Sequence, residues 1–364
     1  MSSGKEERAR EVGKLGGWSG SGAQHNPHNR FFKLEYGKFH AEGIDDWEEE
    51  EARTQFIEVH PKTIVNRVDS PDVGMMYSLN PYQGCEHGCT YCYARNSHEY
   101  WGYSAGVDFE RKILVKKNAP VLLEKELQKP NWEVHSISLS GNTDCYQPAE
   151  RKYLITRKCL EVLHKYNHPV GIITKNALVT RDVDILGEMA AKRLAGVSIS
   201  ITSLNEDTRR ALEPRTASVR KRLEAVEILS KAGIPVNVMI APVIPGITNH
   251  EVLPIIKAVA DRGAVSVAHT IVRLNGAIGE IFYEWLEKYF PDRKMKVIHQ
   301  IQEVHGGKLN DSRFGTRMRG EGNFADQVSQ MMRLGREKYL KGKVWPETDR
   351  SLFLRTNKGQ TSLF

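Results

Sequence analysis

Three cysteines within eight residues carry the clearest chemistry in this sequence. Cys85, Cys89 and Cys92 lie in residues 80–92, where a proline and two glycines predict a tight loop. Three thiolates on such a loop can converge on one metal centre. A structural zinc site closes with four protein ligands, whereas three cysteines on a [4Fe–4S] cluster leave one iron open. The sequence therefore predicts an iron–sulfur cluster held by these three cysteines.

Two alternatives to a cluster stay open at this stage. The first is zinc with a distant histidine as fourth ligand, and the second is cysteines without a metal. His87 lies only two residues from Cys85 and from Cys89, which makes simultaneous tetrahedral ligation awkward. We interpret His87 as a loop histidine that hydrogen-bonds near the metal ligands instead.

A second chemical pattern is a row of hydroxyls. Residues 198–202 alternate so that Ser198, Ser200 and Thr202 share one face of an expected strand. Buried hydroxyls need hydrogen-bond partners, and a polar ligand can supply them. Bonds to one another or to the backbone would satisfy the hydroxyls equally well.

The elements that must position these residues follow an alternating pattern. Short apolar runs alternate with segments of helical periodicity, which predicts parallel βαβ units. We expect strands at 75–79, 134–139, 170–174, 196–201, 236–240 and 265–271. Expected helices cover 151–166, 182–193, 218–232, 250–262 and 279–289, with an amphipathic helix over 324–340.

Such a succession forms an open doubly wound sheet or a curved, partly closed barrel. In both folds ligands gather at the carboxyl ends of the strands. The cysteine loop and residues 141–148 and 242–249 would meet there. We divide the chain into a leader and acidic linker (1–55), a core (56–300), a helical extension (301–355) and a flexible tail (356–364).

The composition narrows the class of protein. The chain has 364 residues, a formal net charge of +7 and five cysteines, an odd number that does not suggest a disulfide framework. No apolar stretch reaches the length of a membrane span, and the first residues lack a secretory signal. We therefore expect a cytoplasmic protein without a membrane partner. The positive charge permits nucleic-acid binding but does not establish it.

The spacing Cys-x3-Cys-x2-Cys after the first strand of a βα array, with aromatic Tyr91 before the last cysteine, resembles the radical S-adenosylmethionine (SAM) superfamily. A narrower resemblance, to the spore-photoproduct-lyase-related or "DNA repair photolyase"-like group, covers roughly residues 60–330. The matching segments are 69–71, 80–95, 143–150, 173–175, 181–182, 212–214 and 241–246.

The resemblance implies a partial (β/α)6 TIM-like barrel with N- and C-terminal extensions. It also implies a [4Fe–4S] cluster whose fourth iron chelates the amino and carboxylate groups of SAM. An electron from the cluster then cleaves SAM, and the 5′-deoxyadenosyl radical abstracts hydrogen from a substrate. The electron would come from a donor such as flavodoxin or ferredoxin.

The same resemblance assigns roles around SAM. Residues 140–144 would contact the amino group through the backbone, and Ser200 would meet the ribose or carboxylate. Arg215 is a candidate clamp on the carboxylate, and Lys175 could offer charge to substrate or cofactor. Tyr91 and the segment 242–246 would border the adenine. The implied cofactor-binding set is Tyr91, Ser140, Gly141, Asn142, Thr143, Asp144, Ser200, Arg215, Val243 and Ile244.

Cys145 departs from the group, which we expect to carry proline at this position. Spore photoproduct lyases use a pocket cysteine as hydrogen donor, which makes Cys145 a candidate donor; incidental replacement is the alternative. If Cys145→Ala left the products unchanged, the donor role would be dropped. Cys159, on an expected amphipathic helix, is most simply a core residue.

Two further segments point to partners. Residues 313–319 mix arginines with Phe314 in a glycine-containing loop, which suits a phosphate-bearing strand as well as solvent. The tail residues Gln360, Leu363 and Phe364 resemble the short peptide that docks bacterial repair proteins on the DNA sliding clamp.

The leading functional prediction is a radical SAM enzyme acting on nucleic acid, such as a damaged DNA base. The alternatives are the same chemistry on RNA, a peptide or a metabolite, and a non-catalytic metal-binding module docked on the clamp.

Overall fold

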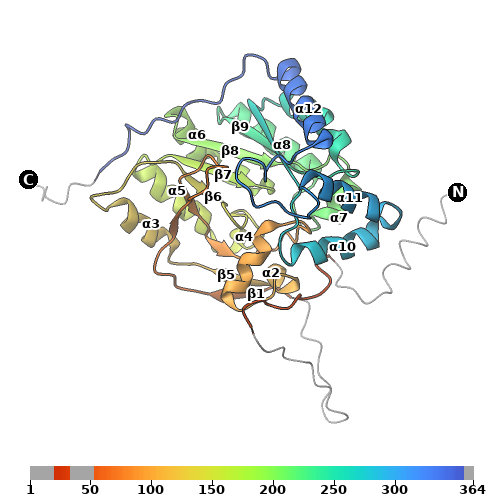
Figure 1. Ribbon diagram of the computed structural model, residues 1–364. Coiled ribbons are helices and arrows are strands. Elements are labelled where there is room, and N and C mark those ends of the chain that lie inside the picture. The colour runs from red at the N-terminus through yellow and green to blue at the C-terminus, as the bar shows by residue number, and fades with distance from the viewer. Residues whose placement is uncertain (1–19, 33–52, 356–364) are drawn as a thin grey trace, which may run out of the picture.

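The structure, a computed structural model, describes residues 20–32 and 53–355 (Figure 1). Its main element is a seven-stranded sheet in the order β10–β9–β8–β7–β6–β3–β2. Neighbours from β3 to β10 run parallel, and β2 pairs antiparallel with β3 at one edge. The strands are β2 (Val65–Arg67), β3 (Tyr77–Leu79), β6 (Ile137–Leu139), β7 (Val170–Thr174), β8 (Ala195–Ser200), β9 (Val236–Val243) and β10 (Ser266–Ile271).

Helices connect the parallel strands and cover the sheet. The crossover helices are α5 (Ile155–Lys165), α6 (Val183–Ala191), α8 (Val219–Lys231) and α9 (Val252–Ala260). Ser218 caps α8 by accepting a hydrogen bond from the amide of Lys221, and Gly233 follows that helix with a φ of 76°. Further helices are α2 (Val107–Arg111), α3 (Ala119–Leu127), α7 (Glu206–Leu212), α10 (Ile278–Tyr289), α11 (Lys294–Val304) and α12 (Asn323–Tyr339).

The predicted fold class is confirmed. Consecutive strands from β3 to β10 are neighbours in the sheet and all parallel, as βα repeats require. Within the described residues, β10 and β2 form the two ends of the strand order, so the sheet is open rather than a closed barrel. Side chains such as Leu139, Ile172, Val197 and Val238 are buried in one continuous core that holds the strand ends in place.

Some element boundaries differ from the sequence prediction. The helix expected over 151–166 is broken at Leu154, whose φ of 54° separates α4 (Glu150–Tyr153) from α5. A three-stranded sheet of β1 (Gln55–Glu58), β5 (Lys112–Val115) and β4 (Tyr82–Gln83) was not anticipated. Helices α3 and α11 were also not anticipated.

The chain ends lie partly outside the described residues. Of the predicted leader and linker, residues 20–32 pack against the cysteine loop and α10, as detailed below. The tail with Gln360, Leu363 and Phe364 is outside the described ranges. Among the helices that are described, none combines the length and apolar character needed to cross a bilayer.

Candidate cluster and cofactor site

The three cysteines open onto one cavity of about 440 Å³ at the carboxyl ends of the strands. Cys85 and Cys89 are buried and Cys92 is partly exposed. Backbone hydrogen bonds fix the loop, because the Cys85 amide donates to Phe109 O at 2.8 Å and the Thr90 amide to Leu212 O at 3.0 Å. Burial raises the pKa of the Cys85 and Cys89 thiols, so a positively charged metal centre is what would hold them as thiolates.

A buried carboxylate, Glu110, supports the cysteine loop from beneath. Its Oε1 accepts from Arg95 Nη2 at 2.6 Å and its Oε2 from Arg215 Nη2 at 2.7 Å. A Cβ on Gly88, whose φ is +67°, would lie 2.6 Å from Glu110 Oε2, so only glycine fits the loop at this point. Arg95 is itself fully buried and also donates to Cys89 O at 2.9 Å. The sequence analysis did not identify Arg95 or Glu110, since an isolated Arg and Glu fifteen residues apart give no local signal.

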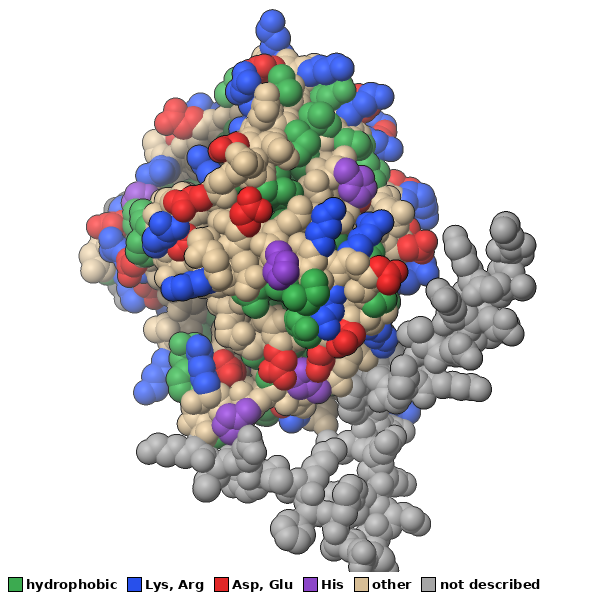
Figure 2. Space-filling model, turned by 45° about the vertical axis from the view of Figure 1, so that its right-hand side comes forward, with side chains coloured by type: hydrophobic (Ala, Val, Ile, Leu, Met, Phe, Trp, Pro, Cys, Tyr) green, Lys and Arg blue, Asp and Glu red, His purple; other side chains and the backbone are tan. Residues whose placement is uncertain are grey.

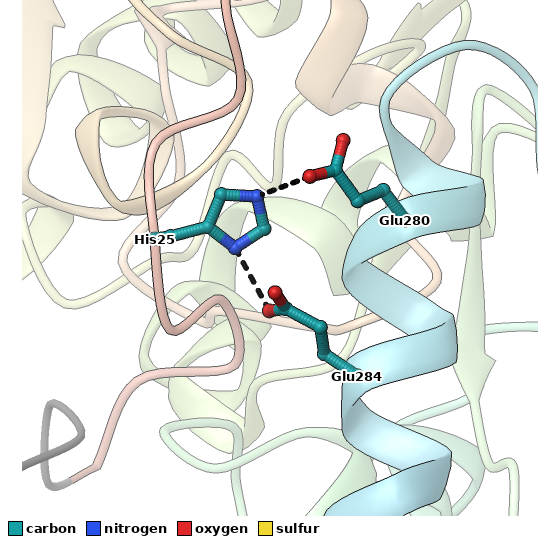
Figure 3. Close-up of side chains that lie close together, drawn as sticks. All are labelled: His25, Glu280 and Glu284. Atoms are coloured by element: carbon teal, nitrogen blue, oxygen red, sulfur yellow. Dashed lines mark hydrogen bonds and ion pairs between the residues drawn. The ribbon is translucent and has the colours of Figure 1, made fainter.

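An N-terminal segment, residues 20–32, lies against this loop. The amides of Gly22 and Ala23 donate to Glu110 at 3.1 and 2.8 Å. Figure 3 shows His25 of this segment pointing toward α10, where Nδ1 pairs with Glu284 at 2.8 Å and Nε2 with Glu280 at 2.9 Å. Since both imidazole nitrogens face carboxylates, we describe these three residues as a clasp between the segment and α10.

His87 makes contacts through both of its ring nitrogens. Its Nδ1 lies 3.3 Å from Asp144 Oδ2, and its Nε2 lies 3.2 Å from Asn176 Nδ2. Both nitrogens are therefore engaged, which agrees with the interpretation of His87 as a hydrogen-bonding neighbour of the ligands. Burial alone would raise the pKa of Asp144, but His87 and the amides of Lys175 and Tyr146 outweigh it and lower the pKa to about 2.

The segment after β6 forms one wall of the cavity, which Ser140, Gly141, Asn142, Thr143 and Asp144 all line. Its backbone is rigidly held: Ser140 has a φ of 72°, and its Oγ accepts from the Cys145 amide at 2.6 Å. Thr143 Oγ1 donates to Tyr82 O at 2.7 Å. A Cβ on Gly141 would lie 2.7 Å from Ser78 Cβ, so this position requires glycine for close packing on β3.

A buried polar network lies behind Tyr91, another residue of the cavity lining. Tyr91 donates its hydroxyl to Glu213, Thr202 Oγ1 donates to Glu213 Oε1 at 2.7 Å, and Arg222 pairs with Glu213 Oε2. Burial would raise the pKa of Glu213, but Arg222 and Lys175 hold it at about 2. Lys175 lines the cavity with its Nζ 5.9 Å from the Tyr91 ring centroid. Ser200 lines the cavity beside this network.

Several predicted residues do not reach the cavity. Arg215 is not among the lining residues, because its guanidinium pairs with Glu110. Val243 and Ile244 are fully buried in the apolar core, and their neighbours Ala241 and Pro242 line the cavity instead. Cys145 is fully buried in the main core and is also not a lining residue. Cys159 is a core residue, as expected.

The rim of the cavity, defined as its lining residues that are also partly exposed at the surface, includes residues that the sequence analysis missed. Arg273 follows β10 and reaches the rim, where Tyr93 and Arg317 also lie. Arg317 belongs to the basic segment 313–319 that the sequence singled out. Arg273 could have been found from its place directly after the sixth expected strand, because ligands gather where parallel strands end.

Comparisons with known proteins add the following similarities. A family model described as "Radical SAM superfamily" matches residues 79–259. An uncharacterized protein of Mycobacterium tuberculosis (strain H37Rv) is 32% identical over 240 residues, 65% of this chain and 71% of that protein. A radical SAM Nalpha-GlyT isomerase of Pseudomonas phage M6 is 24% identical over 208 residues, 56% of this chain and 40% of that protein.

Solved structures of spore photoproduct lyase share the fold. The chain matches one mutant with a TM-score of 0.58 at 16% identity over 87% of both chains. It matches the complex with dinucleoside spore photoproduct with a TM-score of 0.57 at 16% identity, over 79% of this chain and 80% of that one.

Proposed function

Because the chain belongs to the radical SAM superfamily, we propose that it uses a [4Fe–4S] cluster and SAM to abstract a hydrogen atom from a substrate. The observation that carries the proposal is the arrangement of three thiols on one loop at a cavity whose other walls offer polar backbone and buried charge. Cys85, Cys89 and Cys92 would hold the cluster, and its fourth iron would face the cavity.

The residues fit a cluster better than a single zinc ion. Zinc holds sulfur ligands at about 2.3 Å, so thiolates sharing one zinc lie within about 4 Å of one another. Among the described residues, a set of three ligand atoms all within 4.8 Å is found at His25, Glu280 and Glu284, and the three thiols do not form such a set. The more widely spaced ligands of a cluster suit this loop. The cavity of about 440 Å³ lies in the usual range for small-molecule sites.

A cluster held by Cys85, Cys89 and Cys92 would supply the electron for reductive cleavage of SAM. The protein's own residues bind and orient. We assign the amino group of SAM to the backbone of residues 140–144, whose left-handed turn and close packing on Ser78 fix its geometry. Tyr91, held by Glu213, would border the adenine, and Ser200 would meet the ribose or carboxylate.

The positions of Arg215, Lys175 and Cys145 in the structure bear on the roles proposed for them. Since Arg215 pairs with Glu110, we propose that it supports the cysteine loop instead of clamping the carboxylate. Lys175 is a cation that lines the cavity near Cys89 and Glu213. Burial lowers the pKa of Lys175, but the Glu213 carboxylate, and Cys89 in its thiolate form, outweigh burial and raise it. A hydrogen-donor role for Cys145 would require its thiol to become accessible from the core.

For the substrate we propose nucleic acid, with an unusual or damaged DNA base as the first candidate. Support comes from the similar fold of spore photoproduct lyase, whose solved complex contains a dinucleoside spore photoproduct. RNA, a peptide or a metabolite remain the alternatives with the same chemistry.

Radical SAM enzymes need a reductant, for which we propose flavodoxin or ferredoxin. Docking on the DNA sliding clamp through Gln360, Leu363 and Phe364 stays a prediction, to be tested by deleting the last five residues.

The test is anaerobic reconstitution of the full chain with iron and sulfide. The expected result is a cluster whose EPR signal changes when SAM is added, together with 5′-deoxyadenosine after reduction. Deuterated candidate oligonucleotides should transfer label into 5′-deoxyadenosine. A colourless protein that binds one zinc and produces no 5′-deoxyadenosine would contradict the proposal and favour a metal-binding module.

Matched cysteine variants sharpen this test. Cys85→Ala, Cys89→Ala and Cys92→Ala should each lose most of the bound iron. Cys159→Ala, a buried cysteine on α5 away from the cavity, is the control and should retain it. Equal iron content in all four variants would exclude the three-cysteine site.

A further inference from the structure

Arg273 is a half-buried cation at the rim of the cavity. It follows β10 and lines the cavity. Among residues 20–32 and 53–355, its guanidinium makes no hydrogen bond and no ion pair within 4.0 Å. Burial and the neighbouring Arg317 both lower the pKa of Arg273. The surroundings of Arg273 therefore disfavour the charged form of its guanidinium.

The acidic groups nearest to Arg273 are already bound to other arginines. Asp72 and Asp311 act on Arg273 only from beyond ion-pair distance. Arg317 pairs with Asp72 and donates to Ser70 Oγ at 2.6 Å. Arg313 pairs with Asp311 at 2.9 Å. Within the part of the chain that the structure describes, the Arg273 guanidinium is therefore left without a directly bonded acidic partner at this rim.

An uncompensated and partly buried charge costs folding free energy, so its retention indicates an anionic ligand. A guanidinium offers a planar fork that matches the oxygens of a phosphate or carboxylate.

Two exposed aromatic side chains, Tyr93 at the rim and Phe314 beside the rim residue Arg317, favour a nucleotide as the source of the anion. Tyr93 is 53% exposed, and its hydroxyl donates to Gly141 O at 2.8 Å, which fixes its ring beside the cavity. Phe314 is 58% exposed, and the guanidinium carbon of Arg317 lies 4.4 Å from the centroid of the Phe314 ring. Exposed rings beside arginines are the combination that binds single strands, by base stacking and phosphate contact.

The net charge of the protein does not explain this site. On the face that Figure 2 presents, Lys and Arg side chains lie among Asp and Glu, without a continuous basic surface. On this face, positive charge is therefore interspersed with negative charge rather than concentrated at one site.

We propose that Arg273 binds a backbone phosphate of a single-stranded or unpaired nucleotide whose base or sugar enters the cavity. Tyr93 would stack on a neighbouring base. This inference rests on the proposed function and adds to it a phosphate contact that discriminates a polynucleotide from a free base or a peptide.

The experiment measures binding of a fluorescent oligothymidylate of about 12 nucleotides, within the usual footprint of single-strand sites, to the anaerobic holoenzyme at several salt concentrations. Arg273→Gln should weaken binding about ten- to a hundredfold, the effect of one charge-assisted hydrogen-bonded pair. The plot of log association constant against log salt concentration has a negative slope. Its magnitude should decrease by about 0.7, the value for one phosphate contact on a single strand. Arg273→Lys should restore the slope but only part of the affinity.

Two controls separate this contact from general effects. Arg293→Gln removes one exposed positive charge before α11, outside the cavity lining, and should bind like the wild type. With an oligothymidylate whose linkages are all uncharged methylphosphonates, wild type and Arg273→Gln should bind equally.

The inference is overturned if wild type does not bind the oligonucleotide, or if Arg273→Gln keeps the affinity and salt slope of the wild type. It is also overturned if Arg273→Gln weakens SAM binding and leaves oligonucleotide binding intact, because the arginine would then hold the cofactor's carboxylate. The proposed function fails separately, when wild-type holoenzyme forms no 5′-deoxyadenosine.

Discussion

At the scale of single residues, the site contains buried charged side chains that form ion pairs and hydrogen bonds with one another. Glu213 meets Tyr91, Thr202 and Arg222, while Lys175 adds a second positive charge nearby. Such a network holds the Tyr91 ring at the cavity without relying on the cofactor. Because the network is buried, removal of one partner leaves the remaining polar groups unsatisfied and destabilises the fold.

The first prediction concerns this network. Glu213→Gln removes the negative charge and leaves Arg222 and Lys175 uncompensated, so unfolding free energy should fall by about 3–5 kcal/mol. Urea denaturation of the apoprotein measures this loss. Glu224→Gln is the control, since Glu224 pairs with Arg220 on the exposed face of α8, and should change stability by less than about 0.5 kcal/mol. Similar losses in both variants would contradict the role of the network.

His168 provides a second prediction, for pH. Its Nε2 accepts from Trp132 Nε1 at 3.1 Å and its Nδ1 donates to Pro169 O at 3.0 Å, so the folded protein needs the neutral ring. Burial lowers its pKa to about 4. An unfolded histidine titrates near 6.5, so between about pH 6.5 and 4 the unfolded chain binds more protons and stability falls as the pH falls.

The expected contribution of His168 to this loss is about 2 kcal/mol between pH 7 and pH 5. Urea unfolding at both pH values should therefore show a smaller loss for His168→Gln than for wild type. His98 and His269 have similarly lowered pKa values of about 4, so part of the dependence should persist in the variant. An unchanged pH dependence in His168→Gln would show that this ring is not a source of it.

At the scale of elements, the cavity wall formed by residues 140–144 is a turn that follows β6. The turn lies against β3 at Gly141. Two hydrogen bonds stabilise it: the Cys145 amide donates to Ser140 Oγ, and Thr143 Oγ1 donates to Tyr82 O. Its shape is therefore set by the neighbouring strand as much as by its own sequence.

The prediction at this scale is a steric one. Gly141→Ala would bring a Cβ to 2.7 Å from Ser78 Cβ, and overpacking of this kind costs about 1–3 kcal/mol. We expect weaker SAM binding by the reconstituted protein, measured by equilibrium dialysis. Gly171→Ala in β7 is the control, since its Cβ would meet only Ser136 Oγ at 3.9 Å. Adding Ser78→Gly to Gly141→Ala should restore binding; failure of this rescue would refute the steric explanation.

The elements also show what the sequence could predict. The six parallel strands were predictable because each is a short apolar run bounded by turns. The meeting of Cys85, Cys89 and Cys92 at one cavity was predictable because they lie close together in sequence. The break at Leu154 was not, because leucine in a left-handed conformation has no local sequence signal. Glu110 with Arg95 and Arg215, and Arg273 at the rim, depend on contacts between distant segments that a single sequence does not reveal.

At the scale of the whole molecule, residues 20–32 cover the cysteine loop. The segment is bound at Glu110 by two amides and at α10 by the His25 clasp (Figure 3). It therefore lies between the cluster loop and solvent on that side.

The last prediction tests this cover. Glu280→Gln with Glu284→Gln weakens the clasp, and two exposed pairs contribute about 1 kcal/mol together. Opening of the segment should become about fivefold more frequent, so the cluster should bleach faster in air, as followed by visible absorbance. Glu287→Gln on the same helix, which pairs with Lys294 instead, is the control. Equal bleaching rates in all three proteins would show that the clasp does not protect the cluster.

The same segment imposes an order on biosynthesis. Residues 20–32 leave the ribosome early, yet the surfaces that receive them, Glu110 and α10, are synthesised about ninety and more than two hundred and fifty residues later. Until α10 emerges, the cysteine loop has no complete cover. If the loop holds a cluster as proposed, the interval between synthesis of the loop and docking of the segment is when the loop is open to receive iron and sulfide.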